Sequence, residues 1–514
     1  MPADSRLNAL FVTADQWRGD CLSALEHPVV KTPVLDALAA DGVLFNAHYC
    51  QAVPCGPSRA SLYTGLYLMN HRSATNGTPL DRRHANFAQL LRAAGYDPIL
   101  FGYTDTSVDP RDYPPDDPKL RTYEGILPGM TLGVHVNTED VAAWATALAA
   151  RGYAIPERQS ELLRRKRSEV DWEDGAPAPA PLAIDARDDD THFVTNRAIE
   201  YLRSRGGDTH PWCVHLSLLR PHPPFVAAEP YNALYPPGDM PAPVRAATRE
   251  DEAAQHPWLA RQVMHSGHRT PRREGTRQRL QACYYGLMSE VDEALGRVFD
   301  VLRETGDWDR TLVIFTSDHG EQMGDHWLMG KCGYFDQSYR VPLIVRDPRA
   351  IAAATRGRIV ARFTEHVDVL PTLLDALALA APPSCDGYSL APFLHAATEP
   401  ARWRTEAFWE YDFRNAQDDG IERALGVPMH ACNLAVLRGS RYKYVHFAAL
   451  PPLLFDLDDD PNELVDRSRD PAYASVLVEQ AQKMLSLRMR HADQTLTHLR
   501  LTDEGVVARR GARW

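Results

Sequence analysis

The stretch that decides the fold is Ala9-Leu-Phe-Val-Thr-Ala14, a short apolar run that ends at Asp15. Such a run is typical of a strand that is buried on both faces of a parallel sheet. Thr32-Pro33 then predicts the start of an amphipathic helix, with Thr32 as its cap, that stops at Asp41-Gly42. Val43-Leu-Phe45 is the next predicted strand, so strand and helix alternate from the beginning of the chain.

The same alternation continues downstream. Further helices are predicted at 86–94, 195–203 and 277–303, and further strands at 98–101, 212–217, Thr311–Thr316 and 341–345. We therefore expect an α/β fold with a doubly wound, mainly parallel sheet flanked by helices.

The length of 514 residues predicts two or three domains. We expect a catalytic α/β domain at 1–400, interrupted at about 140–190 by a surface insertion or oligomer arm that includes a charged, helical stretch at 161–173. Shorter strands at 433–438, 441–445 and 453–456, followed by a helix at 472–490, predict a smaller C-terminal α+β domain with an antiparallel sheet at 401–514.

Composition excludes several function classes. The chain carries 56 basic and 68 acidic residues, a net charge of −12, which argues against nucleic acid as a partner. It has no apolar run near the roughly 18 residues of a membrane span and no secretory signal pattern, so we expect no membrane association and a cytoplasmic location. Eight scattered cysteines form no disulfide framework and no zinc-finger spacing.

Polar residues follow two of the predicted strands. Asp15-Gln16 comes after the first strand and Asp318-His319 after the strand at Thr311–Thr316. Ligands of open α/β sheets gather at the carboxyl ends of the strands, and these side chains suit a divalent cation such as Mg²⁺, Ca²⁺ or Mn²⁺. The alternative is that each Asp only caps a turn.

A third feature is Val53-Pro-Cys55-Gly-Pro57-Ser-Arg59. Pro57 fits the first position of a helix, which places Cys55 just outside a helix N-terminus. The helix dipole and Arg59 would lower the pKa of a thiol there. The alternative, a buried structural cysteine, fits poorly between two prolines and beside an arginine.

Cys55-Gly-Pro-Ser-Arg59, followed by Thr64-Gly65, resembles the signature of the sulfatases within the alkaline phosphatase superfamily. The resemblance implies that Cys55 is oxidised to formylglycine, whose hydrated aldehyde supplies the nucleophilic oxygen. Other segments that resemble family motifs are Arg220-Pro-His222-Pro-Pro224, the run from Asp318 to Lys331, 367–374 and 454–463. The resemblance extends from Asp15 to about Asp466.

Several segments look most similar to phosphonate monoester hydrolases, relatives that also cleave sulfate esters and phosphodiesters. These segments are Asp15-Gln-Trp-Arg18, Cys55-Gly-Pro57, 65–71 and 95–98. Many arylsulfatases have a second Asp in place of Gln16, an Asn in place of His319 and a Gly-Lys-x-His segment where this chain has Gly102-Tyr-Thr-Asp105. Phosphonate hydrolases share the Tyr but tend to have Thr at position 105.

The resemblance implies a role for each site residue. It assigns one divalent ion, Ca²⁺, Mn²⁺ or Mg²⁺, to Asp15, Gln16, Cys55, Asp318 and His319. Arg59 and Lys331 would stabilise negative charge on the diol and the transferring group. His222 is the expected general acid, and Asp105 or His222 the base that releases the product. Asn76 and Tyr103 are expected substrate contacts.

The expected partners are a small anionic ester, a formylglycine-installing enzyme and further copies of the chain in a dimer or tetramer, with the tail at 506–514 a candidate subunit contact. Phosphonate monoesters, sulfate esters and phosphodiesters can share one site, because each presents a singly negative tetrahedral centre at neutral pH. Two alternatives remain open: a two-metal phosphodiesterase or phosphomutase of the same superfamily, and a non-catalytic scaffold in which Cys55 is not converted.

Overall fold

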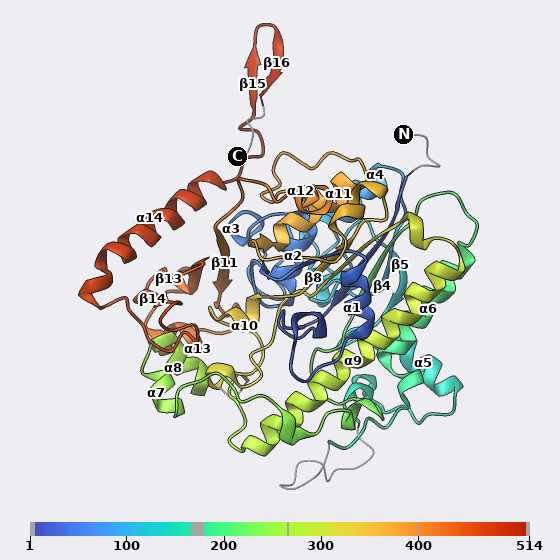
Figure 1. Cartoon of the computed structure of the whole chain (residues 1–514), viewed down its shortest axis with the longest axis horizontal. Helices are drawn as coiled ribbons and strands as arrows, with labels where there is room; N and C mark the ends of the chain where they lie inside the picture. The colour runs from blue at the N-terminus through green and yellow to red at the C-terminus, as the bar shows by residue number, and fades with distance from the viewer. Residues whose placement is uncertain (1–5, 166–178, 265–266, 397, 510–514) are drawn as a thin grey trace.

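The computed structural model describes residues 6–165, 179–264, 267–396 and 398–509. Its centre is a sheet of eight strands in the order β5-β4-β6-β1-β7-β8-β2-β9 (Figure 1). The strands are β1 Asn8–Ala14, β2 Val43–Phe45, β4 Pro98–Gly102, β5 Thr131–His135, β6 Cys213–Leu218, β7 Thr311–Thr316, β8 Leu343–Arg346 and β9 Arg358–Val360. All neighbouring pairs are parallel except the two that involve β8, which is antiparallel to β7 and β2. The predicted doubly wound, mainly parallel sheet is confirmed.

Both faces of the sheet are buried, as the continuous apolar run of β1 predicts. Leu10 and Val12 belong to one core cluster, and Ala9 and Phe11 belong to the cluster on the opposite face. The first cluster includes residues of α1 Pro33–Ala40, α5 Ala142–Ala150, α6 Asp190–Ser204 and α9 Glu274–Glu304. The second includes residues of α2 Cys55–Thr64, α4 Phe87–Ala93, α11 Val369–Ala376 and α12 Ala391–His395.

The C-terminal part forms the predicted antiparallel sheet, in the order β11-β12-β13-β14. The strands are β11 Glu406–Asp412, β12 Asn433–Gly439, β13 Tyr442–Phe447 and β14 Leu453–Asp456, and α14 Ala474–Arg490 packs on this sheet. Sequence reasoning missed β11. One apolar cluster joins Trp409 of β11 to Tyr49 and Tyr334 of the main part, so the two parts share buried surface. The boundary at 400/401 stays a prediction.

The remaining elements are short. They are α3 Leu68–His71, α7 Arg249–Ala253, α8 Pro257–Met264, α10 Asp336–Tyr339, α13 Gly420–Leu425, and the two-stranded pair of β3 His48–Tyr49 with β10 Thr364–Glu365. Figure 1 shows a hairpin of β15 Leu499–Thr502 and β16 Gly505–Ala508 that stands away from the rest of the molecule.

Thr32 does stand at the N-cap position of α1, but its side chain makes no capping hydrogen bond. Its hydroxyl instead accepts a hydrogen bond from the backbone N–H of Ser23, at 3.0 Å. The free N–H groups of Val34 and Leu35 at the start of α1 are bound by the carboxylate of Asp292 on α9, at 3.0 and 2.8 Å. A distant acid, which no local pattern reveals, therefore replaces the predicted cap.

The expectation of a surface insertion at about 140–190 is wrong for much of its described part. Trp144 and Leu148 of α5 are buried in the main core, and Trp144 Nε1 donates to the carbonyl of Asp188 at 2.7 Å. The predicted helix at 161–173 begins inside a 3₁₀ turn at Gln159–Leu163, whose Leu162 and Leu163 are also buried, and its remainder lies mostly outside the described residues. Within the described part of this stretch, the two apolar positions are the ones that pack inward.

All eight cysteines are buried. Among the described residues, no helix combines the length and the apolar character that crossing a bilayer requires.

Candidate active site

The candidate site lies at the carboxyl edge of the main sheet, where β4, β6, β1 and β7 run side by side in parallel. Asp15 directly follows β1, and Asp318 follows its neighbour β7. Tyr103 follows β4, and His222 lies in the segment that leaves β6. Parallel strands end at one edge, so residues far apart in the sequence meet here.

Four of the five expected metal ligands form one cluster. One ligand atom from each of Asp15, Cys55, Asp318 and His319 lies within 4.8 Å of the others, and all four residues are buried. His319 Nε2 lies 3.2 Å from Cys55 Sγ, and 3.7 Å from both Asp15 Oδ1 and Asp318 Oδ2. The structure thus brings the two acidic strand ends and the cysteine motif together.

The donor set of this cluster fits a divalent cation. Asp15 Oδ1 is a buried carboxylate oxygen with no hydrogen-bond partner, an arrangement that costs free energy unless a cation or proton satisfies it. His319 Nδ1 donates to the carbonyl of Gly320 at 3.0 Å, which leaves the lone pair of Nε2 facing the cluster. Two carboxylates and a neutral imidazole are ligands that Mn²⁺ and related divalent ions accept.

Arg59 holds the two carboxylates of the cluster. Its side chain is fully buried; Nη2 lies 3.1 Å from Asp15 Oδ2 and Nε lies 3.0 Å from Asp318 Oδ2. Burial alone would raise the pKa of Asp15. His222 and His319, which are protonated at the low pH where Asp15 titrates, together with Arg59 outweigh burial and keep that pKa well below its usual range. Its Nη1 also donates to Ser217 Oγ at 2.8 Å, and its expected role beside the diol stays a prediction.

Gln16, the fifth expected ligand, reaches the site with its amide already engaged. Lys331 Nζ donates to Gln16 Oε1 at 2.6 Å, and Gln16 Nε2 donates to Glu321 Oε2. Glu321 Oε1 in turn accepts from the backbone N–H of Gly330. Sequence reasoning missed Glu321; the available signal was its place in the run Asp318-His-Gly-Glu321, three residues after a strand-end Asp.

Lys331 is held as a cation in this environment. Burial disfavours its ammonium form, but Cys55, Asp15 and Asp318 outweigh that penalty and raise its pKa above the usual value.

Cys55 differs from its prediction in two respects. Helix α2 begins at Cys55 itself, two residues earlier than the placement of Pro57 at its first position predicts. The predicted lowering of the thiol pKa is also wrong: burial and the Asp15 carboxylate raise the pKa of Cys55 well above its usual value. A helix N-terminus is a weaker influence than two buried carboxylates within a few ångströms.

The expected substrate contacts lie around Cys55 in different ways. Asn76 Oδ1 accepts from the backbone N–H of Gly56 at 2.9 Å, and Asn76 is exposed, so it lies next to Cys55 on the side open to solvent. Tyr103 is buried: its hydroxyl donates to Asp15, and its ring centroid lies 4.4 Å from the guanidinium carbon of Arg59. Tyr103 therefore supports the acidic cluster in this structure, whereas the sequence had placed it on the substrate.

A glycine places Tyr103 there. Gly102 has a φ of +109°, and a Cβ at this position would meet the carbonyl oxygen of Ser217 at 1.7 Å. The backbone that leaves β4 thus runs against β6 so closely that only glycine fits.

Asp105 and His222 complete the surroundings of the cluster. Asp105 is buried, its Oδ1 has no hydrogen-bond partner, and burial raises its pKa to about 8. His222 Nδ1 donates to the carbonyl of Pro223 at 2.7 Å, and burial together with Lys331 lowers its pKa to about 3. Before an anion binds, Asp105 is therefore mostly protonated at neutral pH and His222 is neutral.

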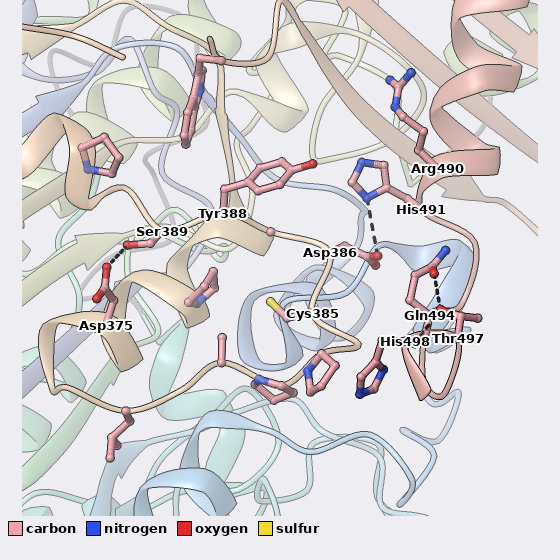
Figure 2. A pocket seen from close by; sticks show the side chains of 18 of the residues that line it. Asp375, Cys385, Asp386, Tyr388, Ser389, Arg490, His491, Gln494, Thr497 and His498 are labelled. Carbon is pink, nitrogen blue, oxygen red and sulfur yellow. Dashed lines mark hydrogen bonds and ion pairs between the residues drawn. The ribbon is translucent and has the colours of Figure 1, made fainter. Parts of the chain in front are cut away.

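A cleft of about 790 Å³ lies elsewhere, at the base of the hairpin β15–β16 (Figure 2). Figure 2 shows Asp386, Tyr388 and His491 among its lining residues, with His491 paired to Asp386. None of the predicted site residues lines it, so its volume does not identify the active site.

Comparison with known proteins agrees with this geometry. The chain matches the family model described as Sulfatase over residues 7–379 and the one described as N-sulphoglucosamine sulphohydrolase, C-terminal over residues 324–490. It is 44% identical over 523 residues to the multifunctional alkaline phosphatase superfamily protein PehA of Trinickia caryophylli, covering 98% of this chain and 99% of that protein. An arylsulfatase of Clostridium perfringens is 25% identical, with 91% of each chain covered.

Two solved structures match almost the whole chain. The phosphonate monoester hydrolase of Agrobacterium radiobacter has a TM-score of 0.91 and 46% identity, covering 98% of this chain and 100% of that one. The phosphonate monoester hydrolase SpPMH from Silicibacter pomeroyi also has a TM-score of 0.91, with 39% identity, covering 99% of this chain and 100% of that one.

Proposed function

The chain belongs to the sulfatase family of the alkaline phosphatase superfamily and is a hydrolase of ester bonds, and on this premise we propose its chemistry in detail. We propose that it hydrolyses singly charged phosphonate monoesters, sulfate esters and phosphodiesters with a formylglycine made from Cys55 and one divalent cation. The observation that carries the proposal is the buried cluster in which Cys55 Sγ lies 3.2 Å from His319 Nε2, beside Asp15 and Asp318.

Two observations support this substrate class. Proteins named phosphonate monoester hydrolase and arylsulfatase are among those similar to the chain. Gln16 stands where many arylsulfatases have a second Asp, so the site carries one negative charge fewer. A less negative site accepts anionic esters more readily, and the buried ammonium of Lys331 adds attraction.

We assign the cation to Asp15, Asp318, His319, the side chain made from Cys55, and the amide oxygen of Gln16, which is also bonded to Lys331. Bound there, a divalent ion such as Mn²⁺, Ca²⁺ or Mg²⁺ would polarise the nonbridging oxygens of the ester. The hydrated aldehyde made from Cys55 by a formylglycine-installing enzyme would supply the nucleophilic oxygen.

The remaining residues have separate tasks. Arg59 keeps Asp15 and Asp318 ionised and fixed in place, and Lys331 binds the anionic group during transfer. His222 protonates the leaving oxygen; an anion bound beside it favours the imidazolium form and raises the low pKa that His222 has without substrate. Asn76 contacts the substrate on the side open to solvent, and Tyr103 acts through Asp15.

We assign Asp105 as the base that releases the product. Its carboxyl is buried and its Oδ1 has no partner, so it is free to take a proton. Because its pKa is raised to about 8, the base form is scarce at neutral pH and becomes more abundant as the pH rises.

The test is a panel of an aryl phosphonate monoester, an aryl sulfate and a phosphodiester, assayed from about pH 5 to about pH 10. We expect turnover of all three, with kcat/KM for the phosphonate at least about tenfold above that for the sulfate, or about 1.4 kcal/mol of barrier. We also expect kcat to rise with pH. The midpoint of this rise should lie far above the ordinary pKa of an aspartate and close to the raised pKa of Asp105, about 8.

Asp105→Asn is the matched variant for this panel, because it keeps the shape and removes the titration. It should lower kcat and lose the rising limb. A sulfate preference would move the assignment to arylsulfatase, an unchanged limb in Asp105→Asn would remove Asp105 as the base, and turnover of none of the three esters would end the proposal.

The two-metal alternative has less support in the residues that the structure describes. Such sites hold two ions roughly 3.5–4 Å apart, which requires two adjoining sets of donors. The other group of His, Cys, Asp and Glu side chains within ligand distance, Asp189 with His192 and Glu290, lies between α6 and α9 and shares no residue with the cluster at Cys55.

We also propose that the chain forms a homo-oligomer, a dimer or tetramer, through its C-terminal hairpin. The register places Leu499, Leu501, Val506 and Ala508 on one face of the two strands, and all four are exposed. A lone two-stranded hairpin is marginally stable in water, so a second copy that covers this face stabilises it. Three apolar side chains of α14 are also exposed: Val478, Leu485 and Met489.

We expect sedimentation to give a mass that is a multiple of the chain mass. The double variant Leu501→Glu/Val506→Glu, which places two charges on the apolar face, should shift it toward the monomer. A wild-type protein that sediments as a monomer would contradict the proposal.

A further inference from the structure

Arg220 lies inside the segment that carries His222. It follows β6 and is 1% exposed, although it is a charged residue of the motif Arg220-Pro-His222-Pro-Pro224. Its Nη1 donates to the carbonyl of Pro224 at 2.9 Å and to the carbonyl of His222 at 3.4 Å. One guanidinium thus binds the backbone of the loop on both sides of Pro223.

The same guanidinium anchors this loop to two other parts of the chain. Nε and Nη2 lie 3.2 and 3.1 Å from Asp190 Oδ1, at the first residue of α6. Nη2 also contacts the carbonyl of Leu163 at 3.4 Å, in the segment expected to be a surface insertion. Asp190 is 3% exposed, so the ion pair is shielded from solvent and is not a weak surface pair.

His222 is fixed from both ends by this arrangement. Its backbone N–H donates to the carbonyl of Leu219, its backbone carbonyl accepts from Arg220, and its Nδ1 donates to the carbonyl of Pro223. With Nδ1 engaged, only Nε2 remains to face a substrate. Proton transfer requires a heavy-atom distance of about 2.6–3.2 Å, and a displacement of about 1 Å can cost 100-fold in rate.

We propose that Arg220, held by Asp190, is a positioning residue that sets the place of His222 Nε2 for protonation of the leaving oxygen. The inference rests on the proposed function, in which His222 is the general acid. Lysine cannot replace arginine here, because a single ammonium group lacks the planar fork that reaches two loop carbonyls, Leu163 and Asp190 together.

The test compares wild type, Arg220→Lys and His222→Ala on aryl esters whose leaving phenols span pKa values from about 4 to about 10. A poor leaving group depends on protonation and a good one does not. We expect both variants to show a steeper dependence of kcat/KM on phenol pKa, with Arg220→Lys losing about 10- to 100-fold on the poorest leaving group and little on the best.

The matched control is Arg346→Lys. Arg346 is also buried, pairs with Asp41 at 2.6 Å and donates to the carbonyls of Trp308 and Thr311, but it lies at the opposite edge of the sheet. It should lower thermal stability as Arg220→Lys does and leave the leaving-group dependence unchanged. In the double variant Arg220→Lys/His222→Ala, the dependence should be no steeper than in His222→Ala alone.

Each outcome decides the proposal. If Arg220→Lys lowers kcat/KM by the same factor for every leaving group, its dependence on phenol pKa equals that of wild type. Arg220 is then only structural, which overturns the inference and leaves the proposed function intact. If the dependence of kcat/KM on phenol pKa is unchanged in His222→Ala, His222 is not the general acid. That result overturns both the inference and the proposed mechanism. If Arg220→Lys does not fold, Asp190→Asn, which keeps shape and weakens the anchor, must show the same steepening to a smaller extent.

Discussion

Cys55→Ala is expected to abolish turnover of every ester in the panel, by roughly 10⁴-fold or more. The change removes the side chain from which the proposed formylglycine nucleophile is made, while Asp15, Asp318 and His319 should keep their positions. The loss should therefore appear in kcat, measured with purified protein, and the variant should still melt cooperatively.

Intact-protein mass spectrometry complements this variant. Wild type from a host that installs formylglycine should be roughly 18 Da lighter than its sequence mass, with the deficit located in the Cys55 peptide. Cys432→Ala is the matched control, because Cys432 is a buried thiol of the C-terminal part; it should keep both the deficit and the activity. An unshifted Cys55 peptide in fully active protein would falsify the formylglycine mechanism and leave a hydrolase that works without formylglycine, whereas an unshifted peptide in inactive protein would leave the non-catalytic scaffold.

Asp15→Asn is expected to lose the bound ion and to lower kcat/KM by more than about 100-fold. Loss of a residue that only hydrogen-bonds to a metal ligand costs about 10- to 100-fold, and the loss of a ligand itself should cost more. The variant replaces the carboxylate whose Oδ1 has no protein partner and whose Oδ2 faces Arg59. With one negative charge fewer, the cluster has a lower affinity for a cation, and elemental analysis should fall from one ion per chain toward none.

Added metal separates affinity from chemistry in this variant. A large excess of Mn²⁺ or Ca²⁺ should restore part of the activity of Asp15→Asn by mass action. Asp375→Asn, in the remote cleft of Figure 2, removes an acid of the same kind and should retain wild-type metal content and rate. Full metal content and activity in Asp15→Asn would refute the assignment of the ligands.

The sequence predicted six of the eight strands of the main sheet because those six are continuous apolar runs, which favour burial between helices. It missed β5 and β9, the two outermost strands, which are partly exposed. It also predicted that Asp15 and Asp318 would meet, since both follow strands and parallel strands end at one edge. The strand ends and a predicted helix start also pointed to His319 and Cys55, and the family motif added Lys331, which the fold places beside the cluster through Gln16.

Other features depended on neighbours that no local pattern identifies. The cap of α1 comes from Asp292, and Trp144 Nε1 is bound by the carbonyl of Asp188, 44 positions away in the sequence. Tyr103 and Arg59 face the acidic ligands because β4, β6 and α2 converge on them, which is a property of the packed sheet.

The sequence by itself determined the α/β architecture and which residues could carry the chemistry, because hydrophobic periodicity and motif spacing are local properties of the chain. Only the tertiary structure decided their electrostatic state: Cys55 has a raised thiol pKa, although its helix position predicted a lowered one, and Asp105 has a pKa of about 8. The physical reason is that burial and the charges of residues distant in sequence set the energy of an ionised group, and both exist only after the chain has packed.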